Sequence, residues 1–416
     1  MENAATIHAR QSVPVAALGR YALAAGTFLS GFVLYEPAPY ELFMAGLIAL
    51  WFLFGLRISR SSAILLTILM VFNCGGILSL TVMSDLGPDP LLYLGVSFFL
   101  AISAVFFAAV IEDDWTRLKT VFNAYLAGTL ATGLLGILGY FGALPASELF
   151  TLYDRAKGAF QDPNVFGPYL VLPACFLLHN ILAGKLASSV PRLVALSILT
   201  LAIFLSFSRA AWGLYGFSIL MLVFFMLLNE RSTAFRMRIF VISICGILLM
   251  AITIGIALQF EQVSNLFFLR AQLVQEYDIE QLGRFDRYRL GFLLAMERPL
   301  GVGPMAFGKL FHQDPHDIWL KALMAYGWLG FLAYATLVIW TLVAGFKCLL
   351  RPRTWQPYFL CAYIVFFGHI LISTIIDTDH WRHFYILLGI IWGCIGLENR
   401  YLRQSPGRRS SGSAPA

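Results

Sequence analysis

Residues 90–111 read PLLYLGVSFFLAISAVFFAAVI and contain no charged side chain. A helix of about 20 apolar residues is long enough to cross the roughly 30 Å hydrocarbon core of a bilayer. Similar stretches recur along the 416-residue chain, which is 59% hydrophobic, 15% aromatic and only 12% charged. Soluble domains carry about 25% charged residues. The sequence therefore predicts an all-α integral membrane protein and excludes a soluble globule.

Apolar windows of this length predict a polytopic bundle of about 12 transmembrane helices. The expected spans are 15–35, 40–56, 62–83, 90–111, 120–142, 165–183, 191–207, 210–229, 239–258, 318–346, 355–376 and 384–398. Two connections are long, 143–164 and 259–317, and long ordered loops are often functional. We expect one transmembrane unit over residues 1–403 and a disordered tail over 404–416, where Ser, Pro and Gly are frequent.

The basic residues predict the orientation of the bundle. Eighteen of the 29 Lys and Arg residues fall in the termini and connections that this map places on one side, from Arg10 to Arg409. The first two connections on the other side, 35–40 and 82–90, contain none. Because Lys and Arg collect in short cytoplasmic loops, both termini should be cytoplasmic and 259–317 should lie outside. This bias also accounts for the net charge of +6, so we exclude a nucleic-acid partner.

Ionisable residues are scarce inside the predicted spans. His369 lies near the middle of one span, His179 lies toward the inner end of another, and Glu41 lies at an outer edge. An ion-coupled transporter usually needs carboxylates at mid-membrane depth. Ionisable and polar residues gather instead at the outer helix ends, in 162–164, 206–209, 284–289, 314–317 and 377–383. This distribution indicates chemistry at the outer leaflet.

Two elements carry arginines that are candidates for phosphate contact. Arg209 lies in a very short outer turn, and residues 283–299 form a predicted amphipathic helix that carries Arg284 and Arg287. The apolar side of this helix comprises Phe285, Tyr288, Phe292 and Ala295. Such arginines can snorkel to lipid phosphate, or they can bind a substrate phosphate through the planar guanidinium. The sequence leaves both interpretations open.

His316 is the best candidate for a general base. It lies in Asp314-Pro315-His316-Asp317, and Asp317 can cap a helix that starts at Ile318. A loop histidine is more often structural. One that lies between two carboxylates and after a proline turn can accept a proton from a reacting hydroxyl.

The last outer turn, Asp377-Thr378-Asp379-His380-Trp381-Arg382-His383, holds five ionisable groups in seven positions. Their spacing matches no strong metal-ligand pattern, so no metal is predicted. We expect either an ion-pair network that closes over the site or contacts to an acceptor sugar. The candidates for those contacts are Asp379, Trp381 and Arg382.

Several short motifs occur in a fixed order along the second half of the chain. They are Asp162-Pro163-Asn164, Ser208-Arg209, Gly283-Arg284, Pro299-Leu300-Gly301-Val302-Gly303-Pro304, Pro315-His316 with Leu320, and Gly327-Trp328-Leu329-Gly330. In these motifs, residues 150–395 resemble the O-antigen ligase and polymerase superfamily, which are integral membrane glycan transferases of the bacterial envelope. Many relatives have asparagine where this chain has Asp317.

The resemblance implies an enzyme without metal or cofactor in the bacterial inner membrane. Its donor would be a glycan on undecaprenyl pyrophosphate, and its acceptor a glycan or lipid-linked hydroxyl at the periplasmic face. His316, Arg284 and Arg209 would be catalytic, and the substrate-binding residues would be Arg287, Asp317, Asn164, Asp379, Trp381 and Arg382. We favour a ligase that acts on lipid A core sugar; a polymerase of O-antigen or exopolysaccharide repeats stays open. A transporter or flippase for lipid-linked sugars is the alternative from another class.

The topology is directly testable. A cysteine introduced within 259–282 should react with an impermeant thiol reagent in intact spheroplasts, whereas a cysteine placed after Ser405 should not, because Lys and Arg mark the cytoplasmic side. The opposite labelling pattern would overturn the predicted orientation.

Overall fold

The structure, a computed structural model, describes residues 13–184, 189–229, 232–272, 283–311 and 313–404. The helices, together with one 3-10 turn and two short strands, are α1 (Val13–Leu29), α2 (Pro39–Leu53), α3 (Arg60–Leu80), α4 (Pro88–Asp113), α5 (Arg117–Tyr140), η1 (Ser147–Phe150), β1 (Thr151–Leu152), β2 (Arg155–Ala156), α6 (Pro163–Tyr169), α7 (Val171–Ala183), α8 (Val190–Leu205), α9 (Arg209–Asn229), α10 (Thr233–Ala257), α11 (Glu261–Ala271), α13 (Arg284–Glu297), α14 (Ala306–Phe311), α15 (Ile318–Leu349), α16 (Gln356–Ile372) and α17 (Arg382–Gln404).

The predicted all-α membrane architecture is confirmed, and every predicted span coincides with a helix or, at α6–α7, with a consecutive pair. Within the described ranges, seven helical segments are long and apolar enough to cross a bilayer. They are α3, α4, α5, α6–α7, α9, α10 and α15. The helices α2, α8 and α16 are shorter but also apolar. The tail predicted over 404–416 lies, after Gln404, outside the described residues.

The core of the bundle is built around α17, which packs closely on α4. Small residues make this approach possible, as is common where helices pack in membranes. A Cβ atom at Gly389 would lie 2.8 Å from the carbonyl oxygen of Ala104, and one at Gly393 would lie 2.9 Å from that of Ala108. Nearly every residue of α17 from Arg382 to Glu398 is buried. The 377–383 turn, which leads into this central helix, therefore lies at the middle of one end of the bundle.

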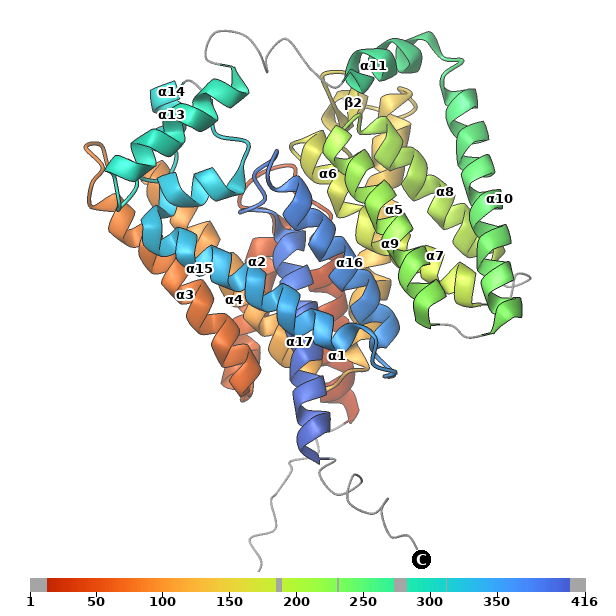
Figure 1. Cartoon of the computed structure of the whole chain (residues 1–416), viewed down its shortest axis with the longest axis horizontal. Helices are drawn as coiled ribbons and strands as arrows, with labels where there is room; N and C mark the ends of the chain where they lie inside the picture. The colour runs from red at the N-terminus through yellow and green to blue at the C-terminus, as the bar shows by residue number, and fades with distance from the viewer. Residues whose placement is uncertain (1–12, 185–188, 230–231, 273–282, 312, 405–416) are drawn as a thin grey trace, which may run out of the picture.

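That end of the bundle also carries the elements of the two long connections. In Figure 1, α11, α13, α14 and β2 lie at one end, and the C-terminal end of α17 lies at the opposite end. The 143–164 connection forms η1 and the β1–β2 hairpin, in which Thr151 pairs with Ala156. The 259–317 connection contains three helices in its described part. Of these local structures, the sequence predicted only the helix that starts at Arg284.

Helix α15 is broken at Gly327, and the Pro299–Pro304 loop fills the break. Gly327 has φ of +64°, so the helical hydrogen bonds around it are interrupted. The loop replaces them: the N–H groups of Val302 and Gly303 donate to Met324 O at 2.8 and 3.2 Å, and Trp328 N–H donates to Pro299 O at 2.8 Å. Backbone groups freed at membrane depth must find such partners. The break thus fixes the loop that follows α13.

Helix α13 forms where the amphipathic helix was predicted and packs against α15. Ala295 is fully buried, and Trp328 Nε1 donates to its carbonyl oxygen at 3.1 Å. Tyr288 packs in the same cluster, whereas Phe285 and Phe292 of the predicted apolar side are 66% and 51% exposed. Gly291 allows close packing at the buried side, because a Cβ there would lie 2.6 Å from Phe307 and 3.1 Å from Leu320.

The break at Gly327 gives a stability prediction. Gly327→Ala should lower the thermal unfolding temperature of the detergent-purified protein, because its Cβ would lie 2.8 Å from both Leu300 C and Pro299 O and its φ is positive. Strain of this kind costs about 1–3 kcal/mol. Gly216→Ala is the matched control, since nothing lies within 4 Å of a Cβ at that helical position. Equal unfolding temperatures for the two variants would contradict this account of the break.

Candidate active site

His316 lies at the N-terminal mouth of α15, where the sequence placed it. Asp317 caps the helix: its Oδ1 accepts from Trp319 N at 2.8 Å and from Leu320 N at 3.5 Å, which confirms the predicted cap. Burial raises the pKa of Asp317 from its ordinary value, although these two backbone hydrogen bonds oppose the rise. The helix cap therefore fixes the backbone on the C-terminal side of His316.

Three groups surround His316. Nδ1 lies 3.6 Å from Asp377 Oδ1, Nε2 lies 3.3 Å from Gln313 Nε2, and the His316 carbonyl accepts from Tyr288 OH at 2.8 Å. An amide nitrogen can only donate, so in this arrangement Nε2 of His316 accepts and Nδ1 faces Asp377. The His316 side chain is 36% exposed.

Lys321 is the residue of this group that sequence reasoning missed. Its Nζ lies 2.7 Å from Asp377 Oδ2 and 3.2 Å from Asp379 Oδ1, and its side chain is only 11% exposed. The ammonium also lies 5.4 Å from the centre of the Tyr93 ring. A lysine on the first turn of an otherwise apolar helix was the available signal, because a buried charge needs a partner. The sequence did not show which carboxylates would supply it.

The charges around Lys321 determine which of the neighbouring side chains are ionised. Burial by itself would raise the pKa of Asp377, but the Lys321 ammonium and the hydrogen bond with His316 outweigh it and lower the pKa. Asp379 accepts from the hydroxyl of Tyr93 and, through its carbonyl, from Tyr385 OH at 2.9 Å. Burial lowers the pKa of His380. The group therefore combines a lysine cation, an ionised Asp377 and a neutral His380.

The remaining residues of the 377–383 turn face into the protein. Trp381 is 6% exposed and packs against His383, at 5.1 Å between ring centres, and against His369 at 6.0 Å. Arg382 Nη2 lies 3.1 Å from Glu36 Oε1, and its Nε pairs with Glu41. The turn thus forms ion pairs on both sides. Contacts of Asp379, Trp381 and Arg382 with a sugar stay predictions, and they require access to side chains that are buried here.

Arg209 and Asn164 belong to a second group, at the outer ends of α6, α8 and α9. Arg155, which was not among the candidates, is buried there: Nε donates to Ser206 O at 2.8 Å and Nη2 donates to Asn164 Oδ1 at 2.7 Å. Arg209 Nη1 donates to Gln272 O at 3.0 Å. Arg155 thus fixes the turn from which Arg209 projects. A lone arginine in a predicted loop gave no hint of this role.

The two groups share one end of the bundle. The first outer loop joins them, because Val33 N donates to Ala159 O at 2.6 Å near the second group while Glu36 pairs with Arg382 near the first. Arg284 starts α13, four residues before Tyr288, which holds the His316 backbone. Its side chain lies outside the described part of the chain. Arg287 lies on the same helix and is partly exposed.

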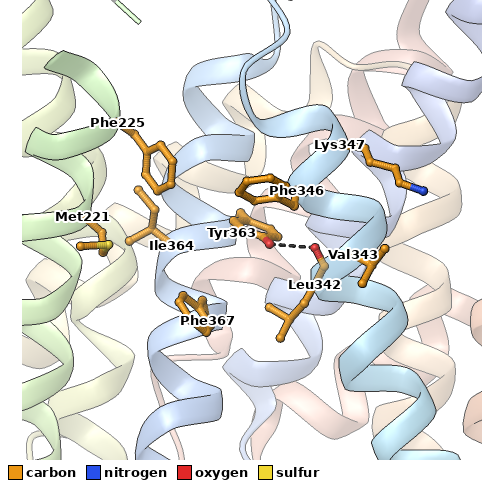
Figure 2. Close-up of a pocket in the computed structure, with 9 residues that line it drawn as sticks. All are labelled: Met221, Phe225, Leu342, Val343, Phe346, Lys347, Tyr363, Ile364 and Phe367. Carbon is orange, nitrogen blue, oxygen red and sulfur yellow. Dashed lines mark hydrogen bonds between the residues drawn. The ribbon is translucent and has the colours of Figure 1, made fainter. Parts of the chain in front are cut away.

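A lateral groove elsewhere in the bundle has a different character. It encloses about 470 Å³ between α9, α15 and α16 and is lined by Met221, Phe225, Leu342, Val343, Phe346, Lys347, Tyr363, Ile364 and Phe367. Figure 2 shows the Tyr363 hydroxyl turned onto the Leu342 carbonyl, to which it donates at 2.8 Å. Lys347, on the last turn of α15, is its one charged lining residue. Apart from Lys347 and Tyr363 the lining of the groove is apolar, so the polar end of the bundle that holds His316 is the candidate site.

The described ranges contain no group of three or more His, Cys, Asp or Glu side chains arranged to hold a metal ion. Asp377 and Asp379 point their carboxylates at Lys321 instead.

Comparison with protein families gives one match: residues 194–335 match the family described as O-antigen ligase. The matched segment contains Arg209, Arg284, His316 and Lys321. A search of curated protein sequences gave no match. The resemblance seen in the short motifs is thereby confirmed over this segment.

Proposed function

We propose that this chain, a member of the O-antigen ligase superfamily through residues 194–335, is a glycan transferase of the bacterial inner membrane. Its donor would be a glycan linked to undecaprenyl pyrophosphate, and its acceptor a sugar hydroxyl at the periplasmic face. The geometry of His316 carries the proposal, because a partly exposed imidazole whose Nδ1 faces a lysine-paired carboxylate is suited to general-base catalysis.

The reaction needs one proton acceptor and one anion stabiliser. The acceptor oxygen attacks the anomeric carbon of the donor, the bond from that carbon to the pyrophosphate oxygen breaks, and the lipid pyrophosphate leaves with the electron pair. The hydroxyl proton passes to Nε2 of His316, in the place now taken by Gln313. Asp377, facing Nδ1 at 3.6 Å, stabilises the imidazolium that forms.

Arginines supply the positive charge that the leaving pyrophosphate requires. A guanidinium is permanently charged and binds phosphate through two parallel hydrogen bonds. Arg209 is fixed at the start of α9, and Arg284 and Arg287 lie on α13, which Tyr288 and Trp328 tie to the His316 backbone and to α15. Lipid snorkelling is the alternative role for these arginines.

The identity of the acceptor distinguishes two kinds of glycan transferase, a ligase and a polymerase. Transfer to lipid A core sugar would make the chain a ligase, which we favour, and transfer to another lipid-linked repeat would make it a polymerase. Incubating the purified protein with lipid-linked oligosaccharide and each acceptor separates the two. Absence of glycan transfer to any acceptor would contradict the proposed function.

A transporter of lipid-linked sugars suits the charge distribution less well. The buried charged residues of the described ranges are Glu112, Arg155, Lys321, Asp379, Arg382 and Glu398. All of them lie at or near helix ends or in the connections between helices. An ion-coupled transport path would require charged groups at mid-membrane depth instead.

Arg284→Lys and Arg209→Lys should each reduce transfer, because an ammonium cannot reproduce bidentate phosphate contact. The loss should correspond to about 2–4 kcal/mol in the activation barrier, the scale of one fixed electrostatic donor. Initial rates are compared at equal membrane abundance. Normal transfer by both variants would favour lipid snorkelling.

His316→Ala should lower transfer by roughly 10²–10⁴-fold, as expected for loss of a general base, while donor affinity stays nearly unchanged. Wild-type transfer should also fall at acid pH, because a protonated imidazole cannot accept the proton of the acceptor hydroxyl. Donor binding and transfer are measured side by side. A collapse of donor affinity in His316→Ala would make His316 a binding residue instead.

A further inference from the structure

Two carboxylates and one buried ammonium lie behind the proposed base. We propose that Lys321 is a positioning residue that offsets the charges of Asp377 and Asp379 and so keeps His316 neutral and correctly oriented. This inference rests on the proposed function, since it assigns Lys321 to the same site. Lys321 touches neither the reacting atoms nor the substrate in this scheme.

The geometry connects Lys321 to His316 through a single carboxylate. Asp377 offers one oxygen to each: Oδ2 lies 2.7 Å from Lys321 Nζ, and Oδ1 lies 3.6 Å from His316 Nδ1. The Lys321 backbone N–H donates to Asp317 O at 2.9 Å. Lys321 therefore lies one helical turn after Asp317, which directly follows His316. The lysine therefore fixes the carboxylate that faces the base.

The charges around His316 can be counted from each element packed against it. The 377–383 turn contributes Asp377 and Asp379, and its His380 is neutral. The segment before α15 contributes the neutral Gln313 and the carboxylates Asp314 and Asp317; α13 contributes the uncharged Tyr288 and carries the basic residues Arg284 and Arg287. Lys321 is the cation that contacts both aspartates of the turn. Its position is therefore decisive for the local field.

Removing this cation changes the protonation of the base in a known direction. Without Lys321, the half-buried Asp377 and the buried Asp379 would attract a proton onto His316. An imidazolium cannot accept the proton of an acceptor hydroxyl. Lys321→Met should therefore move the acid limb of the transfer–pH profile to higher pH. Lys321→Arg, which keeps the charge, should leave the limb in place.

A purely structural role makes a different prediction. If Lys321 only fastened α15 to the 377–383 turn, Lys321→Met would reduce the amount of folded protein or the rate by the same factor at every pH. A shift of the limb, with partial recovery at alkaline pH, separates the two roles. Adding Asp377→Asn to Lys321→Met should move the limb back toward the wild-type position, because it removes the carboxylate nearest His316.

The protonation of His316 can be measured without any transferase assay. Diethyl pyrocarbonate modifies neutral imidazole, so its rate at the His316 peptide, followed by mass spectrometry between pH 5.5 and 9, reports the neutral fraction. In full-length protein in detergent, Lys321→Met should shift this profile upward by about one pH unit, a roughly tenfold slower modification below the limb. Lys309→Met is the control, because Lys309 pairs with Asp85 on the exposed surface instead.

The two readouts keep the inference and the proposed function apart. An unchanged modification profile in folded Lys321→Met would overturn the inference, whatever the transfer assay shows. If Lys321→Met shifts the modification profile but the wild-type protein transfers no glycan, the charge relation is upheld and the proposed function is contradicted. If Lys321→Met does not fold, Lys321→Gln combined with Asp379→Asn still leaves Asp377 unopposed and should shift the profile in the same direction.

Discussion

The break in α15 at Gly327 is the constraint on which the outer end of the protein depends. A helix interrupted at membrane depth must have its freed backbone groups paired, and the Pro299–Pro304 loop supplies the partners. That loop holds the C-terminal end of α13, while the Tyr288 hydroxyl holds the middle of the helix to His316. The left-handed backbone at Gly327 thereby links the helix that carries Arg284 to the proposed base at the start of α15.

Features that depend on local sequence were predictable. Apolar windows located the spans because bilayer thickness sets a minimum helix length, and Asp317 before an apolar run identified a helix cap. Features that depend on distant partners were not. Lys321 and Arg155 look unremarkable in the sequence, because the carboxylates and carbonyls that hold them come from other segments. The close packing of α13 at Gly291 was not predictable either, because its neighbours Phe307 and Leu320 are set by tertiary packing.

The site combines two parts of the chain that differ in their relation to known proteins. Arg209, Arg284, His316 and Lys321 lie within the segment that matches O-antigen ligase, whereas Asp377 and Asp379 lie beyond residue 335. The central position of α17 brings the second part to the first. Packing of the last helix therefore supplies the carboxylate that faces the proposed base. The sequence motifs around His316 do not predict this carboxylate.

The two ends of the bundle use buried charge differently. Away from the outer loops, Glu398 is held by Arg351 and Arg353 at 2.7 Å each, so the acid is fully committed to structural ion pairs. At the outer end, Asp377 has one oxygen on Lys321 and the other on a histidine that is still 36% exposed. The Asp377 pair thus leaves one carboxylate oxygen facing a titratable group, as the proposed base requires, whereas Glu398 is closed by two guanidiniums.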